Sequence, residues 1–204
     1  MIWFTADLHL GHAAILGHCP SRMVQFNDLH TMNKSLIDTI NKHVQSNDIL
    51  YHLGDFCWSA SKAGHYRAKI NCRTIHALQG NHDASSLKKY VSSYAQMIFI
   101  KKYHLHLCHY PLASWWASCR GSQHLHGHCH GRLTEIPNRI DVGIDAIYAK
   151  TGEWRPMCLD EILIQKKDFV TCKDMEHMPP KTLIWTPSGY YECPTCGFRT
   201  DLKN

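Results

Sequence analysis

The chain has 204 residues, a formal net charge of +5 and 17 histidines. Its length fits one sizeable domain with a small appendage, and its charge is below the dense basic face of a dedicated nucleic-acid binder. The apolar runs are too short to cross a bilayer, which argues against a membrane protein.

The ten cysteines do not by themselves indicate a secreted, disulfide-rich protein. Such proteins are short chains with a poor core and a signal peptide, whereas here Met1 is followed by the short apolar run Ile2, Trp3 and Phe4 and then by the polar motif that starts at Asp7. We therefore expect reduced thiols in a soluble, cytoplasmic protein.

The first half of the chain alternates short apolar runs with helical periodicity. Strands are predicted over residues 2–6, 49–53 and 74–79, and helices over residues 27–44 and 59–70. Asn27 and Asp28 are the capping candidates of the first of these helices. The alternation of strands and helices predicts an α/β fold.

The second half begins with further strands and ends differently. Strands are predicted over residues 97–100, 103–108 and 140–144, and residues 1–165 form the predicted catalytic domain. Residues 166–204 contain prolines and little helical periodicity, so we interpret them as an appendage. Its Cys193 and Cys196 resemble half of a zinc-ribbon site, although a pair of reduced thiols is the alternative.

Polar side chains follow the predicted strands. Asp7 and His9 come after the first strand, Asp55 after the second, and the sequence Gly-Asn-His-Asp at residues 80–83 after the third. Three later histidines complete the pattern: His109, His128 and His130. Because ligands bind outside the carboxyl ends of strands in α/β sheets, we expect these residues to converge on one crevice.

Carboxylate, imidazole and amide donors together suit divalent ions. We expect two of them, with manganese favoured and iron, zinc or nickel as alternatives. The two oxygens of Asp55 can bridge ions about 3.5 to 4 Å apart. His104 and His106 are alternatives to His109 as a ligand, because they lie nearby in the predicted strand that precedes His109.

The ordered motifs D-x-H, G-D, G-N-H-D, H and G-H-x-H resemble those of the calcineurin-like metallophosphoesterase superfamily. The resemblance covers residues 1–165 and implies a four-layer α-β-β-α sandwich of two mixed sheets flanked by helices. It implies that Asp55 is shared between two metal ions. It also implies that His82 contacts the phosphate or protonates the leaving oxygen, and that Asp83 orients the His82 ring. The implied ligands are Asp7, His9 and His130 for one metal and Asn81, His109 and His128 for the other.

The stretch D-L-H-L-G-H from Asp7, together with V-G-I-D at residues 142–145, resembles a smaller group of compact bacterial and phage members. In that group His12 and Arg22 would face the phosphate, the alternative being that both are solvated loop residues. Trp115 and Trp116 would either stack on a nucleobase or serve packing.

The resemblance implies hydrolysis in which a hydroxide bridging two metals attacks phosphorus in line. We expect a phosphodiesterase acting on a nucleotide or a nucleic-acid-type substrate. A phosphomonoesterase, a dinucleoside polyphosphate hydrolase and a protein phosphatase are alternatives, and a non-catalytic scaffold of the same fold is a remote one. The sequence leaves both monomer and dimer open.

Overall fold

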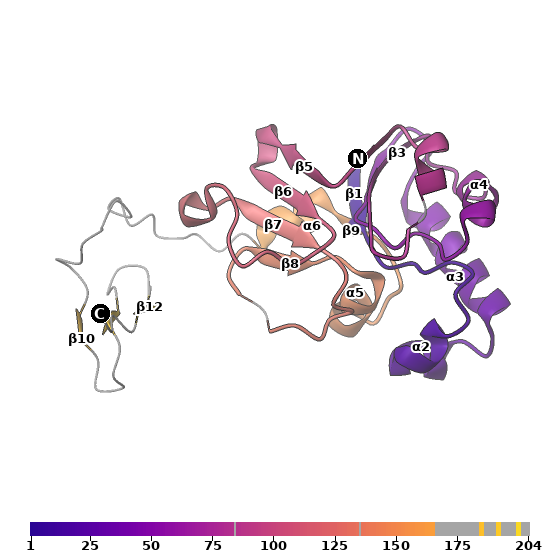
Figure 1. Ribbon diagram of the computed structural model, residues 1–204, viewed down its shortest axis with the longest axis horizontal. Helices are drawn as coiled ribbons and strands as arrows, with labels where there is room; N and C mark the ends of the chain where they lie inside the picture. The colour runs from indigo at the N-terminus through magenta and orange to yellow at the C-terminus, as the bar shows by residue number, and fades with distance from the viewer. Residues whose placement is uncertain (84, 135, 166–183, 186–190, 193–198, 201–204) are drawn as a thin grey trace.

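A computed structural model describes residues 1–83, 85–134 and 136–165, together with three short strands nearer the C-terminus (Figure 1). The first sheet has five strands in the order β4-β3-β2-β1-β9, all parallel except β9. Its strands are β1 (Ile2–Thr5), β2 (Ile49–His52), β3 (Thr74–Leu78), β4 (Ser93–Ala95) and β9 (Met157–Cys158).

The second sheet has four strands in the order β5-β6-β7-β8, of which β5 is antiparallel to its neighbour. They are β5 (Met97–Ile100), β6 (Leu105–Cys108), β7 (Gln123–His126) and β8 (Arg139–Asp141). Phe4 and Leu78 of the first sheet share one apolar core with Leu105 and Leu125 of the second, so the sheets pack face to face. Burial of this shared face is the main stabilisation that holds the sheets together.

Helices flank the sandwich on more than one side, because Met32 packs with the first sheet, whereas Leu159 and Ile162 belong to the core that also contains the second sheet. The helices are α1 (Ile15–His18), α2 (Pro20–Gln25), α3 (Leu29–His43), α4 (Ala63–Ala68), α5 (Ile144–Thr151) and α6 (Leu159–Ile164). The α3 helix begins at its N-cap Asp28, which accepts a hydrogen bond from Thr31 N, and buries Met32, Leu36 and Ile40 at helical spacing. These side chains pack in the same cluster as Trp3, Leu50 and Ile75 of β1 to β3. The predicted α/β sandwich of two mixed sheets with flanking helices is confirmed.

Several boundaries differ from the prediction because local turns interrupt the apolar pattern. Residues 101–103 form the 3₁₀ helix η3 (Lys101–Tyr103), and His104 is left-handed with φ of 55°, so β6 begins only at Leu105. Strand β8 ends at Asp141, because α5 begins at Ile144. The predicted helix over residues 59–70 is the 3₁₀ helix η1 (Ala60–Lys62) followed by α4. Two further 3₁₀ helices are η2 (Ser85–Lys89) and η4 (Ser118–Arg120).

The tail contributes a third sheet with antiparallel neighbours, made of β10 (Ile184–Trp185), β11 (Tyr191–Glu192) and β12 (Arg199–Thr200). Cys193 and Cys196 lie outside the described residues, so the predicted tail metal site stays a prediction, as does the domain boundary at residue 165. Among the described helices, none is long and apolar enough to cross a membrane.

Candidate metal centre

One edge of the sandwich, which we call the rim, is where the carboxyl ends of five strands meet: β1, β2, β3, β6 and β7. The loops after β1 and β2 run side by side there, because Asp7 N donates to Gly54 O at 3.0 Å and His9 N donates to Asp55 O at 2.9 Å. The loop after β7 joins them, since His128 N donates to the Asp7 carboxylate at 2.9 Å. Distant segments thus place their polar residues together, as predicted from the strand ends.

The rim adopts a backbone conformation that L-residues rarely adopt. Several of its predicted ligands have positive φ, a conformation that costs free energy for any residue with a Cβ. These residues are Asp7 (60°), His9 (50°), Asp55 (59°), His128 (69°) and His130 (51°). The left-handed turns aim the side chains at the rim, so the strain is concentrated where the chemistry is expected.

Glycine is required where two loops of the rim touch. A Cβ added to Gly80 would lie 2.1 Å from Asp55 Oδ1, and one added to Gly54 would lie 2.5 Å from His109 Nδ1. Both distances are far below van der Waals contact, so a side chain at either position would displace a predicted ligand.

Asp7, His9 and His130 form what we call the first triad, whose potential ligand atoms lie within 4.8 Å of one another. Neither ring nitrogen of His9 has a hydrogen-bond partner among the described residues, although both are buried. Burial lowers the pKa of His9 to about 2, which keeps the imidazole neutral and able to bind a metal. A cation held by this triad would satisfy the buried nitrogens.

Asp55, His109 and His128 form the second triad, whose ligand atoms also lie within 4.8 Å of one another. The amide oxygen of Asn81 is 2.9 Å from both His109 Nε2 and His128 Nδ1, so it belongs to the same cluster. His109 Nδ1 donates to Leu53 O at 2.8 Å, which leaves Nε2 free for a metal. Burial lowers the pKa of His109 to about 4 and favours this neutral form.

Asp55 of the second triad also reaches the first triad. Its Oδ2 is 3.5 Å from His9 Nε2 and 3.5 Å from His109 Nε2, while its Oδ1 accepts a hydrogen bond from His82 N at 2.9 Å. A carboxylate in this position is suited to contact an ion in each triad.

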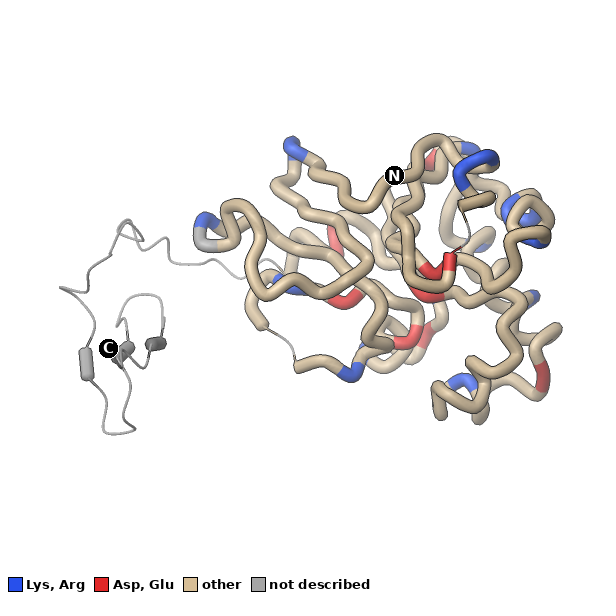
Figure 2. Tube along the Cα trace, viewed as in Figure 1, with Lys and Arg blue, Asp and Glu red and all other residues tan. Residues whose placement is uncertain are grey.

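Buried negative charge also favours cations at the rim. Figure 2 shows acidic residues gathered towards the centre of the molecule, whereas most lysines and arginines lie at its periphery. Burial raises the pKa of Asp7 well above its ordinary value and raises that of Asp55 as well, because nearby cationic side chains do not compensate for desolvation. Donor types, unpartnered nitrogens and charge therefore all fit a pair of divalent ions.

The structure corrects the prediction for Arg22. Its side chain is 0% exposed, and it donates to Asp145 at 2.8 Å (Nε to Oδ1) and 2.7 Å (Nη2 to Oδ2) and to Leu8 O at 3.0 Å. Asp145 Oδ2 in turn lies 2.7 Å from His130 Nδ1. The predicted phosphate contact of Arg22 is wrong, because its donors are engaged inside the protein; Arg22 and Asp145 instead support a ligand of the first triad.

Asp145 also sets the charge of His130. Burial opposes a charged imidazole there, but the hydrogen bond to Asp145 and the nearby Asp7 raise the pKa of His130 to about 10. The same carboxylates would attract a divalent ion to the other ring nitrogen. Sequence reasoning noted Asp145 within the V-G-I-D stretch without assigning it a role, because its partners are distant in the chain.

Asp83 also differs from the expectation. Its carboxylate accepts hydrogen bonds from Asp55 N at 2.7 Å, Phe56 N at 2.7 Å and Gly80 N at 3.0 Å. Both oxygens are engaged with main-chain amides, so Asp83 fixes the loops after β2 and β3 and does not orient the His82 ring.

His12 and His82 lie beside the first triad, and their predicted contact with the phosphate stays a prediction. The His82 ring is 5.4 Å from that of His9 and 6.0 Å from that of His12, measured between centroids. Trp58 stacks on His12 with centroids 3.9 Å apart and an interplanar angle of 10°, and is 49% exposed. Sequence reasoning missed Trp58, whose one signal is its position just after the G-D motif.

The structure also shows which of the other predicted histidines and tryptophans reach the rim. His109 is the histidine of its segment that reaches the rim, whereas His106 is buried beneath Phe99, with centroids 4.4 Å apart. Trp115 Nε1 donates to Ser122 O at 3.1 Å. Trp116 contacts Phe99 at 5.3 Å between centroids, so both tryptophans pack on the second sheet, and neither contacts a predicted ligand.

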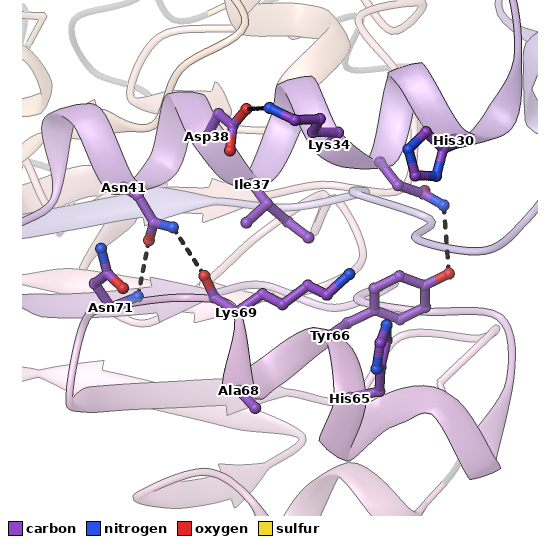
Figure 3. Close-up of a pocket in the computed structure, with 11 residues that line it drawn as sticks. His30, Lys34, Ile37, Asp38, Asn41, His65, Tyr66, Ala68, Lys69 and Asn71 are labelled. Carbon is purple, nitrogen blue, oxygen red and sulfur yellow. Dashed lines mark hydrogen bonds and ion pairs between the residues drawn. The ribbon is translucent and has the colours of Figure 1, made fainter.

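A cavity of about 530 Å³ lies between α3 and α4, among residues that include Ile37, Tyr66 and Lys69 (Figure 3). Its lining contains none of the predicted ligands. The Tyr66 hydroxyl accepts a hydrogen bond from Asn33 Nδ2 at 3.3 Å, and Asn33 Oδ1 accepts one from Gly11 N at 3.1 Å. The two helices therefore hold the turn that precedes His12.

Comparison with known proteins agrees with this geometry. A family model described as calcineurin-like phosphoesterase matches residues 1–192. The chain belongs to this family. Membership implies phosphoesterase activity supported by divalent metals, and the clusters of histidine and aspartate at the rim are the candidate ligands of this calcineurin-like phosphoesterase.

The chain is 32% identical over 180 residues to an uncharacterised protein of Methanocaldococcus jannaschii, an alignment that covers 83% of this chain and 94% of that protein. It also resembles the crystal structure of a protein of unknown function from Aquifex aeolicus, with a TM-score of 0.58 and 20% identity over 80% of this chain and 98% of the other. The second likeness supports the fold alone.

Proposed function

We propose that this chain is a dinuclear-metal-dependent phosphodiesterase that acts on a nucleotide or nucleic-acid-type substrate. The position of Asp55 carries the proposal, because one carboxylate oxygen is 3.5 Å from a histidine nitrogen in each triad. Such a bridge is suited to two ions that act on a single phosphoryl group.

The residues of each triad would hold one ion. Asp7, His9 and His130 are the proposed ligands of one metal, Asn81, His109 and His128 those of the other, and Asp55 is shared. When bound, two divalent ions supply a nucleophilic water and neutralise charge on the phosphoryl oxygens. We propose manganese as the ion, with iron, zinc and nickel as alternatives that metal analysis of the purified protein would distinguish.

His82 is the proposed catalytic side chain. Its main chain is fixed by the hydrogen bond from His82 N to Asp55 Oδ1, and its exposed ring lies next to His9. An imidazole in this position can hydrogen-bond a phosphoryl oxygen and donate a proton to the leaving oxygen. His12 lies beside it and is proposed to contact the same phosphate.

Exposed aromatic side chains flank both triads, which favours a diester over a monoester. Trp58 lies beside the first triad, and Tyr110, which is 45% exposed, packs against His109 and His128 of the second with centroids 5.0 and 4.8 Å apart. A diester has an organic group on each side of phosphorus, so each could contact one aromatic residue. The scaffold alternative is disfavoured because each proposed ligand position holds a metal-binding side chain.

The test compares bis(p-nitrophenyl) phosphate with p-nitrophenyl phosphate as substrates of the purified protein, with manganese added or with a chelator. We expect hydrolysis that depends on metal and prefers the diester. Unchanged activity in the chelator, or no hydrolysis with any of the four metals, would contradict the proposal. A clear preference for the monoester would favour the phosphomonoesterase instead.

A further inference from the structure

A second cavity, of about 440 Å³, adjoins the second triad. Asn81, whose amide oxygen is 2.9 Å from His109 Nε2 and His128 Nδ1, lines it, and Tyr110 forms part of its wall while also packing against the same two histidines. We call this cavity the glutamine pocket, after two of the residues in its lining, which consists of Gln79, Gly80, Asn81, Asp83, Gln96, Met97, Cys108 and Tyr110. Its volume falls in the range of small-molecule sites.

The two glutamines offer hydrogen bonds that the protein does not use. Gln79 follows β3 and Gln96 lies between β4 and β5, and both are exposed. Neither side-chain amide hydrogen-bonds to another described residue. Each amide carries one acceptor and two donor hydrogens, the combination that pairs with the edge of a nucleobase.

The pocket also offers apolar contact to a flat ring. Tyr110 presents an exposed aromatic ring, and Met97 is 51% exposed with an adaptable thioether side chain. Stacking on an aromatic side chain tolerates any base, whereas the amides can distinguish base edges. The pocket therefore combines a stacking surface with polar groups able to fix orientation.

Charge limits what the pocket can bind. No lysine or arginine is among its lining residues, and the carboxylate of Asp83 is engaged with main-chain amides. A further phosphate or a phosphorylated peptide with acidic flanks would find no counter-charge there. An uncharged group that hydrogen-bonds and stacks is favoured instead.

We propose that the glutamine pocket binds the nucleoside portion of a nucleotide-type phosphodiester whose phosphate lies at the metal centre. This inference rests on the proposed function and names the substrate class of the same site. It also assigns Gln79, Gln96 and Tyr110 as residues that determine specificity.

The test uses two diesters with the same leaving group, thymidine 5′-(p-nitrophenyl phosphate) and bis(p-nitrophenyl) phosphate. The measured quantity is the ratio of their kcat/KM values, which does not depend on the fraction of enzyme that is folded. We expect Gln79→Ala and Gln96→Ala each to lower this ratio about fivefold, mainly through KM for the thymidine ester, as expected for one lost neutral hydrogen bond. Gln45→Ala is the matched control, because Gln45 is an exposed glutamine that precedes β2 at the opposite end of the strands.

A separate binding measurement distinguishes failure of this inference from failure of the proposed function. Thymidine itself is titrated against the manganese-loaded protein by ligand-detected NMR, and we expect both pocket variants to weaken its binding about fivefold. An unchanged ratio together with unchanged thymidine binding would overturn the nucleoside pocket while leaving the phosphodiesterase intact. If neither diester is hydrolysed, the proposed function fails, and thymidine binding alone decides whether the pocket recognises nucleosides.

Discussion

The two triads of the metal centre are built by different physical means. In the first, His130 is oriented by a buried carboxylate that is itself paired with a fully buried arginine. In the second, His109 is oriented by the main-chain carbonyl of Leu53, and the neighbouring donor Asn81 is an amide. The orientation of the histidine therefore depends on an ion pair in the first triad, which mutation can remove, and largely on the backbone in the second triad.

The difference extends to the surroundings of each triad. Imidazoles able to contact a phosphate, His12 and His82, lie beside the first. Neutral amides line the pocket beside the second. We propose that a bound diester would place its phosphate near His12 and His82 and one of its organic groups in the glutamine pocket beside the second triad.

Asp55→Asn should have the largest effect, because Asp55 is the proposed ligand shared by both metals. We expect kcat for bis(p-nitrophenyl) phosphate to fall about 10⁴-fold and metal content to fall in both sites, since the neutral amide is a poor bridge. Metal analysis and steady-state kinetics measure these effects. Asp38→Asn is the control, because Asp38 is an exposed residue of α3 that pairs with Lys34. Loss of only one metal would contradict a shared ligand.

His82→Ala tests whether activity can be lost while both proposed metal sites stay intact. We expect kcat to fall about 10²- to 10³-fold with two metals still bound, because His82 is the proposed proton donor and is not one of the proposed ligands. His65→Ala, an exposed histidine of α4, is the control. A simultaneous loss of metal would show that His82 acts as a ligand instead.

Asp145→Asn tests the ionic support of the first triad. We expect a loss of about 3–5 kcal/mol in the free energy of unfolding, because Arg22 is left buried without its counter-charge. Metal affinity of one site should weaken about 10- to 100-fold, as found when a partner of a histidine ligand is removed. Chemical denaturation and calorimetric metal titration measure the two effects.

A double variant separates these two consequences. Arg22→Met with Asp145→Leu removes both charges, so stability should recover while metal affinity at the first triad stays weak. Recovery of the metal affinity as well would mean that Asp145 has no orienting role towards His130.

Trp58→Ala should have the smallest effect, because it removes a proposed contact to the substrate and leaves the proposed ligands intact. We expect KM for bis(p-nitrophenyl) phosphate to rise about three- to tenfold with little change in kcat. Trp116→Ala is the matched control, since Trp116 is 62% exposed and contacts Phe99 of the second sheet. An equal change in both variants would argue against a substrate contact at Trp58.

The sequence predicted the residues whose position follows from strand ends. Asp7, Asp55 and Asn81 each come shortly after a short apolar run, and the structure brings them to one rim as expected. Residues 27–44 were also predicted well, because a long helix repeats its apolar spacing many times before it ends.

The parts that were missed depend on long-range pairing or on brief local turns. Arg22 and Asp145 are 123 residues apart, so spacing alone does not reveal that they meet inside the protein. Asp83 follows His82 directly, yet its oxygens turn towards main-chain amides of two loops. The strand predicted from residue 103 begins only at Leu105, because residues 101–103 form a 3₁₀ helix and His104 is left-handed.

The left-handed residues of the rim have a consequence for the choice of metal. Hydrogen bonds between neighbouring loops, such as Asp7 N to Gly54 O, hold these conformations, so we propose that the ligand positions form when the protein folds, before an ion binds. Different divalent ions would then bind to the same arrangement of donor atoms. Cellular supply of each ion, more than rearrangement of the polypeptide, would then decide which metal the enzyme carries.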